Sequence, residues 1–468
     1  MGLETMGWIS VIPAIIAIVL SFVTRNTIIS LLAACLVGTL AAGQGVMGLP
    51  TLIKTAVGTT DFSWVMLLNL YIAIIVAFFH KTGAIQAFSN WVHERNLSRK
   101  GVQLMAWFLG IFVYFSDSFS PLFVGTVMRD ISDRAKISKE KLSYIADSTA
   151  APVSVLVPIT GWAAYLMGLA VGVGDVADQA TAQRLFVRAI PFNFYPLFSV
   201  IMVGLLASGI LKDFGPMKKA EDRAITTGKV LRDGANPLIG KELMEIEPYE
   251  GLKPRIFLNF LLPVLLIISL ALTTFFVLGS AKTMEVFLGV AIFMGVSMFI
   301  QGIPFGEIMD TVMLGIKSGV PAVTLLALAY SVNSLSKTMG TANFIINNFE
   351  GLLSPAVLPM IIFLVAAIMS FATGSSWGTF AICMPIALPL AFQYTGGVTT
   401  ALVVACFAAV AGGGVFGDHC SPLSDTTILA STGSGADHID HVQTQLPYAF
   451  ICGSLAIIAY LVIGFTSL

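Results

Sequence analysis

The sequence GDHCSPLSDTT, residues 417–427, gathers side chains that bind cations and transfer protons. It places Asp418, Asp425, His419 and four hydroxyl side chains within eleven positions. The fifteen residues before Phe416, ALVVACFAAVAGGGV, carry no charged side chain. An aspartate inside such an apolar segment is costly and is therefore a functional candidate. Carboxylate and hydroxyl oxygens together form the kind of site that hard cations such as Na⁺ prefer.

An earlier stretch, SYIADSTAAP (143–152), repeats this combination of residues. Asp147 comes five residues before a proline, and Asp418 comes four residues before one. Proline and glycine break a helix, and lipid tolerates the freed backbone groups only beside a cavity or a bound ion. We therefore expect two broken helices, with Na⁺ bound at Asp147 and Asp418. The predicted ion-binding residues are Asp117, Asp147, Asp418, Asp425, Ser148, Thr149 and Ser421.

Two more polar stretches lie in the middle of apolar spans. They read FSDSFSP (115–121) and GSSWGTF (374–380). The free amides of a helix end at such a position attract an anionic group of a substrate. The predicted substrate-binding residues are Ser116, Ser118, Gly374, Ser375, Ser376, His419 and Thr426.

Other chemistry is also open for these residues. His419 and Cys420 are zinc-type ligands, but a zinc site needs three or four ligands at set spacings. GSSWG fits the G-x-S-x-G signature of serine hydrolases, with Ser376 as nucleophile and His419 as base, yet that signature needs a strand-turn-helix context. A channel needs a continuous pore, and no filter sequence is evident. The sequence DHIDH (437–441) is interpreted as a cytoplasmic surface loop, with a gate or a pH-sensing role as the alternative. We expect no enzyme and no cofactor apart from Na⁺ and H⁺ as coupling ions.

The composition indicates that membrane helices position the candidate site residues. Hydrophobic residues make up 56% of the chain and charged residues 11%, against about 25% charged residues in soluble domains. Many apolar stretches are close to the roughly 20 residues that cross a bilayer. The sequence predicts an all-α polytopic membrane protein embedded in a lipid bilayer. The net charge of −1 gives no sign of nucleic-acid binding.

Basic residues mark the cytoplasmic side of membrane helices and so suggest the topology. They flank both ends of 102–128, which predicts a re-entrant hairpin; the span 354–393 is predicted to be a second hairpin, open to the other side. The broken helices are predicted at 142–172 and 399–431. Each half of the chain then has a hairpin followed by a broken helix, in opposite orientation, which is typical of secondary transporters. We divide the chain into halves 1–255, ending in a cytoplasmic loop at 212–255, and 256–468.

Two long segments resemble the NhaC family of sodium/proton antiporters. They are GTVMRDISDRAKISKEKLSYIADSTAAPVSVLVPITGW (125–162) and GDHCSPLSDTTILASTGSGADHIDHVQTQLPYA (417–449). The resemblance implies a carrier of the bacterial inner membrane that uses a sodium gradient. It also implies two inverted repeats, an elevator-type movement and a homodimer.

The resemblance leaves two transport functions open. The first is Na⁺/H⁺ antiport. The second is Na⁺-coupled transport of a small organic solute, such as an amino acid. The sodium/dicarboxylate relatives carry Ser-Asn-Thr at the hairpin tips, whereas this chain has Ser116-Asp117-Ser118 and Gly374-Ser375-Ser376. The additional aspartate would repel a second carboxylate and favours a cation or an ammonium group.

Overall fold

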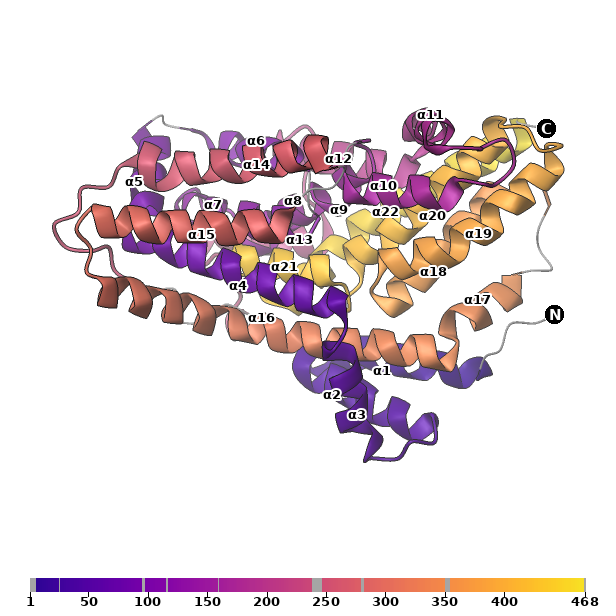
Figure 1. Cartoon of the computed structure of the whole chain (residues 1–468), viewed down its shortest axis with the longest axis horizontal. Helices are drawn as coiled ribbons and strands as arrows, with labels where there is room; N and C mark the ends of the chain where they lie inside the picture. The colour runs from indigo at the N-terminus through magenta and orange to yellow at the C-terminus, as the bar shows by residue number, and fades with distance from the viewer. Residues whose placement is uncertain are drawn as a thin grey trace.

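The computed structural model describes residues 6–24, 26–94, 97–114, 117–158, 160–237, 246–278, 282–349 and 354–466. In these ranges the chain is almost entirely helical (Figure 1), which confirms the predicted all-α class. The first half contains η1 (Gly7–Val11), α1 (Ile12–Thr24), α2 (Thr27–Ala41), α3 (Gly48–Val57), α4 (Thr60–Lys81), α5 (Ala84–Glu94), α6 (Arg99–Phe112), α7 (Phe119–Arg134), α8 (Lys139–Ser148), α9 (Ala151–Ser154), α10 (Gly161–Ala170), α11 (Gln179–Ala189), η2 (Ile190–Phe192), α12 (Phe194–Ala207) and α13 (Gly215–Thr227). The second half contains η4 (Phe257–Leu261), α14 (Leu262–Leu278), α15 (Thr283–Ile300), α16 (Phe305–Met339), α17 (Thr341–Phe349), α18 (Leu358–Thr373), α19 (Ser376–Tyr394), α20 (Ala401–Cys420), α21 (Asp425–Ser434) and α22 (His438–Thr466).

Several helices are long and apolar enough to cross a bilayer. Within the described ranges there are seven, or eight if the bent pair formed by 180–192 and 194–207 is one span. The chain is therefore a multi-pass membrane protein, as predicted. Three other apolar helices, α1, α2 and α18, have only 13, 15 and 16 residues. These three are shorter than the roughly 20 residues that a full crossing requires.

The structure has helix ends at the four places where polar residues interrupt apolar spans. The span 102–128 divides into α6 and α7, which pack on each other, and 354–393 divides into α18 and α19. The broken helices are equally clear, because 142–172 forms α8, α9 and α10. Likewise α20 ends at Cys420 and α21 begins at Asp425. The inverted-repeat relation and the elevator movement stay predictions.

Buried apolar side chains form two core clusters. One is built mainly around α4, α7, α8, α15 and α16, and the other around α10, α11, α18, α19 and α20. Helix α16 has 35 residues and packs against α2, α3 and α4; in Figure 1 it runs along the lower side of the main helical body, with α1, α2 and α3 beneath part of it. The tip of the α18–α19 hairpin points toward α16 (Figure 1).

Helix α20 packs closely on α18 because glycines remove the side chains between them. A β-carbon at Gly413 would lie 2.6 Å from the carbonyl oxygen of Phe363. A β-carbon at Gly417 would lie 2.1 Å from the amide nitrogen of Phe371. Spaced four residues apart, these glycines form the small-residue stripe that lets membrane helices approach closely. This packing fixes the end of α20, where Asp418 lies.

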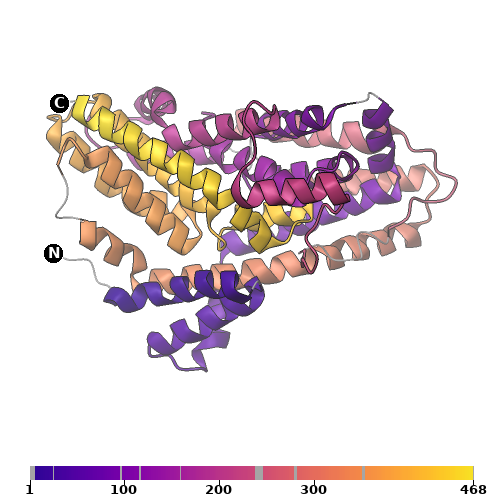
Figure 2. The ribbon, with the colours of Figure 1, turned by 180° about the vertical axis from the view of Figure 1, so that it is seen from behind.

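The loop predicted at 212–255 contains α13, which packs on α8 and α22 (Figure 2). Ion pairs attach it: Lys141 Nζ lies 2.5 Å from Asp213 Oδ1, and Arg223 lies 2.9 Å from Glu140. After α13, Arg232 Nε lies 2.8 Å from Asp440 Oδ2 at the start of α22. Lys141, Glu140 and Asp440 are buried. The segment between the halves is therefore anchored to both of them, although part of it, 238–245, lies outside the described residues.

Candidate functional site

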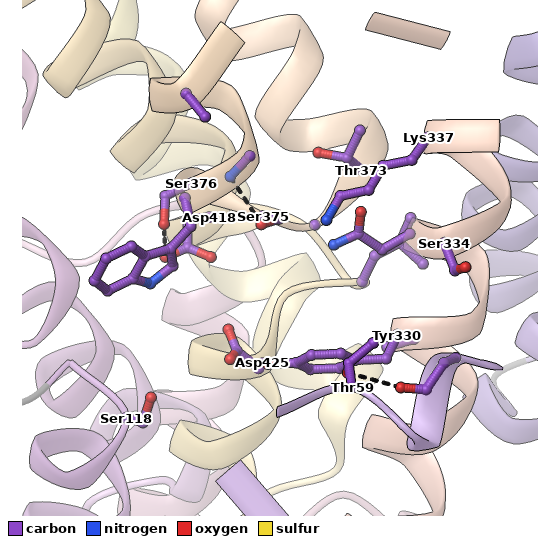
Figure 3. Close-up of a pocket in the computed structure, with 18 of the residues that line it drawn as sticks. Thr59, Ser118, Tyr330, Ser334, Lys337, Thr373, Ser375, Ser376, Asp418 and Asp425 are labelled. Atoms are coloured by element: carbon purple, nitrogen blue, oxygen red, sulfur yellow. Dashed lines mark hydrogen bonds between the residues drawn. The ribbon is translucent and has the colours of Figure 1, made fainter. Parts of the chain in front are cut away.

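A cavity of about 740 Å³ lies where α16 faces the hairpin tip and the break after α20 (Figure 3). Its wall combines charged, hydroxyl and aromatic side chains. The lining residues are Ala56, Thr59, Trp64, Asp117, Ser118, Tyr165, Ala329, Tyr330, Asn333, Ser334, Lys337, Thr373, Gly374, Ser375, Ser376, Trp377, Gly378, Ala381, Ile382, Asp418, Leu423 and Asp425. A volume of roughly 300–1,000 Å³ is usual for small-molecule sites.

The cavity brings together about half of the residues that the sequence indicates. Those that line it are Asp117, Ser118, Gly374, Ser375, Ser376, Asp418 and Asp425. The predicted residues that do not line it are Asp147, Ser148, Thr149, His419, Ser421 and Thr426. Ser116 lies outside the described residues. Both hairpin tips and the second helix break therefore contribute to one site.

Asp418 connects the break after α20 to the hairpin tip. Its Oδ1 accepts a hydrogen bond from Ser424 Oγ at 2.7 Å, and its Oδ2 accepts one from Ser376 Oγ at 3.3 Å. Its main-chain oxygen accepts a hydrogen bond from Thr427 Oγ1 at 3.0 Å. The side chain is almost fully buried. Asp418 is thus held between hydroxyl groups, and within the described ranges no lysine or arginine forms an ion pair with it.

The hairpin tip reaches this position because Gly374 adopts a left-handed backbone. Its φ of +67° ends α18, and Ser375 caps α19 through Gly378 N–H. A β-carbon at Gly374 would lie 2.6 Å from the main-chain oxygen of Leu423. Only glycine combines this backbone with so close an approach. The tip therefore rests directly on the break that follows Asp418.

Three carboxylates surround the same cavity. Asp425 begins α21, Asp418 lies in the last turn of α20, and Asp117 lies just before α7. Like charges that share a site of low dielectric constant repel strongly, and a bound cation offsets that repulsion. With the oxygens of Ser376 and Ser118, the wall supplies the all-oxygen environment that suits Na⁺.

Three residues of the far wall, on α16, were not predicted from the sequence. Tyr330, Ser334 and Lys337 line the cavity, and Figure 3 shows the Lys337 side chain directed at the hairpin tip. No carboxylate of the described residues lies within ion-pair distance of Lys337. The spacing i, i+4, i+7 puts these three side chains on one face of a helix. This helical spacing of polar residues at the end of an apolar span could have predicted the three residues from the sequence.

A second polar cluster surrounds Asp147 and lies apart from the cavity. Asp147 Oδ2 is 3.1 Å from His441 Nε2 and accepts a hydrogen bond from Gln445 Nε2 at 2.9 Å. His419, near the end of α20, connects the two helix breaks, because its Nε2 lies 2.9 Å from Ser148 Oγ at the end of α8. Its Nδ1 lies 2.7 Å from Tyr195 Oη on α12. These side chains are fully or almost fully buried.

The interpretation of DHIDH as a surface loop was wrong. The structure starts α22 at His438 and buries His438 and His441. His438 Nε2 lies 2.9 Å from the main-chain oxygen of Pro422, so it contacts the second helix break. The run looked like a loop because its residues are polar and follow Gly435, which ends α21. The polar residues are buried because the first turns of α22 pack against α8 and α21.

The arrangement does not form a serine hydrolase dyad. Ser376 Oγ donates to Asp418, while both ring nitrogens of His419 lie beside the hydroxyls of Ser148 and Tyr195. A nucleophilic serine needs a base within hydrogen-bond reach. Across the described ranges, no group of three or more His, Cys, Asp or Glu side chains is placed to hold a metal ion.

Comparisons with known proteins agree on the class of this chain. A family described as the Na⁺/H⁺ antiporter family matches residues 153–465. An uncharacterized protein of Haemophilus influenzae is 33% identical over 98% of this chain and 91% of its own length. An arginine/ornithine antiporter of Halobacterium salinarum is 31% identical over 47% of this chain and 46% of its own. A malate-2H⁺/Na⁺-lactate antiporter of Bacillus subtilis is 31% identical over 44% of each chain.

Proposed function

The chain belongs to the Na⁺/H⁺ antiporter family, and from this premise we propose that it exchanges Na⁺ for protons at the carboxylates of the cavity. It is a secondary transporter and not an enzyme. The observation that carries the proposal is the convergence of Asp117, Asp418 and Asp425 on one cavity at a helix break.

In this proposal Na⁺ and protons compete for the same oxygens. Na⁺ is bound by Asp418 and Asp425, with Ser376 and Asp117 completing the site. When Na⁺ leaves, protons replace it, because three unneutralised carboxylates in one buried site repel one another. Ser376 and Ser424 hydrogen-bond Asp418, so binding at this carboxylate also affects the contact between the hairpin tip and the helix break.

We further propose the setting of this exchange. The relatives are prokaryotic transporters, which supports the inner membrane of a bacterium as the location. An elevator-type movement agrees with the proposal, since the cavity lies between the α16 wall and the hairpin, and a homodimer is proposed only because the family resemblance implies it. Crosslinking of single cysteines placed on α16 and on the hairpin tip, with and without Na⁺, would measure whether the two walls move past each other.

The test of the exchange is transport by purified protein in proteoliposomes. An imposed Na⁺ gradient, with the membrane potential clamped, should move protons in the opposite direction, as reported by a pH-sensitive dye. The rate should fall when the Na⁺ gradient is replaced by an equal gradient of choline. Absence of proton movement with Na⁺ alone would reject Na⁺/H⁺ antiport as the whole function.

A second candidate is Na⁺-coupled transport of a small organic solute, and two observations favour it. The cavity of about 740 Å³ is far larger than a dehydrated ion requires. Its wall also contains Lys337 and the rings of Trp64, Tyr330 and Trp377. A lysine repels Na⁺ but attracts a carboxylate, while the aspartates opposite attract an ammonium group. An amino acid carries both charges, and relatives are named for arginine/ornithine and for malate and lactate exchange.

Replacing Lys337 by methionine separates the two candidates. If an organic anion or amino acid is carried, Lys337→Met should weaken its uptake by about 10-fold or more, since a charged hydrogen bond contributes about 1.5–3 kcal/mol. Na⁺-dependent proton movement should persist. The measurement is uptake of a panel of radiolabelled amino acids and carboxylates into the same proteoliposomes. Equal solute uptake by Lys337→Met and the wild type would mean that Lys337 does not bind the solute. The control is Lys317→Met, which lies on α16 but outside the cavity and should take up solute like the wild type.

A further inference from the structure

A second pocket, of about 670 Å³, lies where the predicted cytoplasmic loop 212–255 joins η4 and α14. We call it the α14–α15 pocket. Its lining residues are Gly251, Leu252, Lys253, Arg255, Leu258, Phe293, Val296, Ser297, Ile300 and Gln301. Figure 1 shows the start of α14 and the end of α15 at the same end of the molecule, where α16 begins. The pocket shares no lining residue with the cavity around Asp418, so it is a separate site.

The α14–α15 pocket has an unbalanced positive charge. Lys253 and Arg255 are exposed, and neither lies within ion-pair distance of a carboxylate of the described residues. Lys81 differs, because its Nζ lies 2.7 Å from Glu307 Oε2. Glu250 is exposed and does not line the pocket. Ammonium and guanidinium groups bind phosphate oxygens, and the planar guanidinium can bind two oxygens at once. The pocket therefore suits a phosphate group.

The loop that carries these two basic residues is attached to the end of α4. Tyr249 N–H donates a hydrogen bond to the main-chain oxygen of Lys81 at 2.8 Å, and the Tyr249 ring centroid lies 5.7 Å from Lys81 Nζ. A β-carbon at Gly83 would lie 3.1 Å from Pro254 Cγ, so Pro254 packs on the turn after α4. Because the main chain beside both basic residues is held in place, little of it has to be ordered when a ligand binds.

Amide and hydroxyl groups complete the polar part of the pocket. Asn259 Nδ2 donates to Gln301 Oε1 at 3.2 Å, and Gln301 Nε2 donates to Asn259 Oδ1 at 2.9 Å. This pair connects η4 to the end of α15. Gln301 Nε2 also donates to Ser297 Oγ at 3.1 Å, so the hydrogen of the Ser297 hydroxyl remains available to a ligand. Ser297 therefore adds a neutral donor to the two charged ones.

The remaining wall of the pocket is apolar and belongs to the outer surface of α14 and α15. Val296 is 53% exposed and Ile300 is 78% exposed, and Phe257 on the same outer surface is 63% exposed. The helices 257–278 and 283–300 are long and apolar enough to cross a bilayer, so their exposed side chains face lipid. Basic residues directly before such a span lie at the level of the lipid headgroups, on the side predicted to be cytoplasmic.

We propose that the α14–α15 pocket binds the headgroup of one anionic phospholipid. Arg255 and Lys253 bind its phosphate oxygens, and Ser297 donates a hydrogen bond to the same group. The acyl chains lie along Val296 and Ile300. A free phosphate ion would use only the polar half of the pocket, whereas a phospholipid uses both halves. Helices α15 and α16 both pack on α4, so the bound lipid would also hold the helices that support the far wall of the cavity. The proposal does not depend on the solute or ion that is transported.

The test is the lipid that the purified full-length protein retains in detergent, counted by native mass spectrometry. Phosphatidylglycerol and phosphatidylcholine with the same acyl chains are added in equal amounts. We expect the wild type to retain phosphatidylglycerol preferentially, at one molecule per chain. The double variant Lys253→Gln and Arg255→Gln should retain about 10-fold less of it or lower, and it should fold because both side chains are exposed. Ser297→Asp, which adds a carboxylate to the pocket, should cause a similar loss.

The matched control is the double variant Lys212→Gln and Lys219→Gln. It removes the same charge from the same predicted loop, at exposed positions outside the pocket, and should retain phosphatidylglycerol like the wild type. Equal retention by the pocket variant and this control would overturn the site. Equal retention of the two lipids by the wild type would overturn the role of the headgroup charge. Displacement of the lipid by excess inorganic phosphate would identify a site for free phosphate and would overturn the lipid proposal.

Discussion

Replacing Asp418 by asparagine is expected to abolish Na⁺-dependent transport while the protein still inserts and folds. The carboxylate lies among Ser424, Ser376 and the main chain, and asparagine keeps its shape. Removing the charged partner of a buried cation costs about 3–5 kcal/mol, so we expect a decrease of about 100-fold or more. The measurement is the initial rate of Na⁺-driven flux in proteoliposomes with equal amounts of wild-type and variant protein.

The control for this experiment is a carboxylate outside the cavity. Asp310 is exposed near the start of α16, and Asp310→Asn should transport at the wild-type rate. Gel filtration of the Asp418→Asn protein should give a single symmetric peak. A folded Asp418→Asn protein that transports normally would exclude Asp418 from the mechanism, whatever the solute.

Replacing Gly417 by valine is expected to prevent folding. The β-carbon would lie 2.1 Å from the Phe371 amide nitrogen and 2.5 Å from Ser370 Cβ, so α18 and α20 would have to separate. Overpacking a tight contact lowers the free energy of unfolding by about 1–3 kcal/mol, occasionally more. We expect the larger cost here, because the added side chain would overlap backbone atoms of α18. We expect the yield of monodisperse protein after detergent extraction to fall to a small fraction of the wild-type yield.

A glycine with space around it provides the comparison for this prediction. Nothing lies within 4 Å of a β-carbon placed at Gly289 in α15. Gly289→Ala should therefore be neutral or slightly stabilising, since alanine reduces the freedom of the unfolded chain. Equal yields and melting temperatures for Gly417→Val and Gly289→Ala would mean that α18 and α20 are not packed as described.

The sequence predicted the helix breaks because breaks leave strong local signals. An aspartate followed by hydroxyl residues and a proline inside an apolar span can form few structures in a membrane, because the freed backbone groups must face protein or a cavity. The same argument found the tips at 115–121 and 374–380, since polar residues in mid-span also need a cavity. Asp117, Ser376 and Asp418 were therefore predicted as site residues before any spatial information, and the structure places them on one cavity.

What the sequence did not predict depends on contacts between distant segments. Lys337 was not predicted as a site residue, because nothing local shows that α16 faces the hairpin tip. His441 and Gln445 were missed because their partner, Asp147, is almost 300 positions away. His419 was predicted to bind substrate, whereas the structure places it between Ser148 and Tyr195. Such pairings come from tertiary packing, which no local pattern encodes.

The anchoring of the segment between the two halves has a consequence for biosynthesis. Asp213 accepts a hydrogen bond from Tyr448 Oη, and Arg232 pairs with Asp440, so both contacts need α22. A ribosome makes residues 212–237 long before it makes α22. The contacts with α8 can form first, but the docking of this segment is complete only after α22 has been made. Chains that stall before α22 would leave this segment held by its α8 contacts alone, and so more open to proteolysis than in the finished protein.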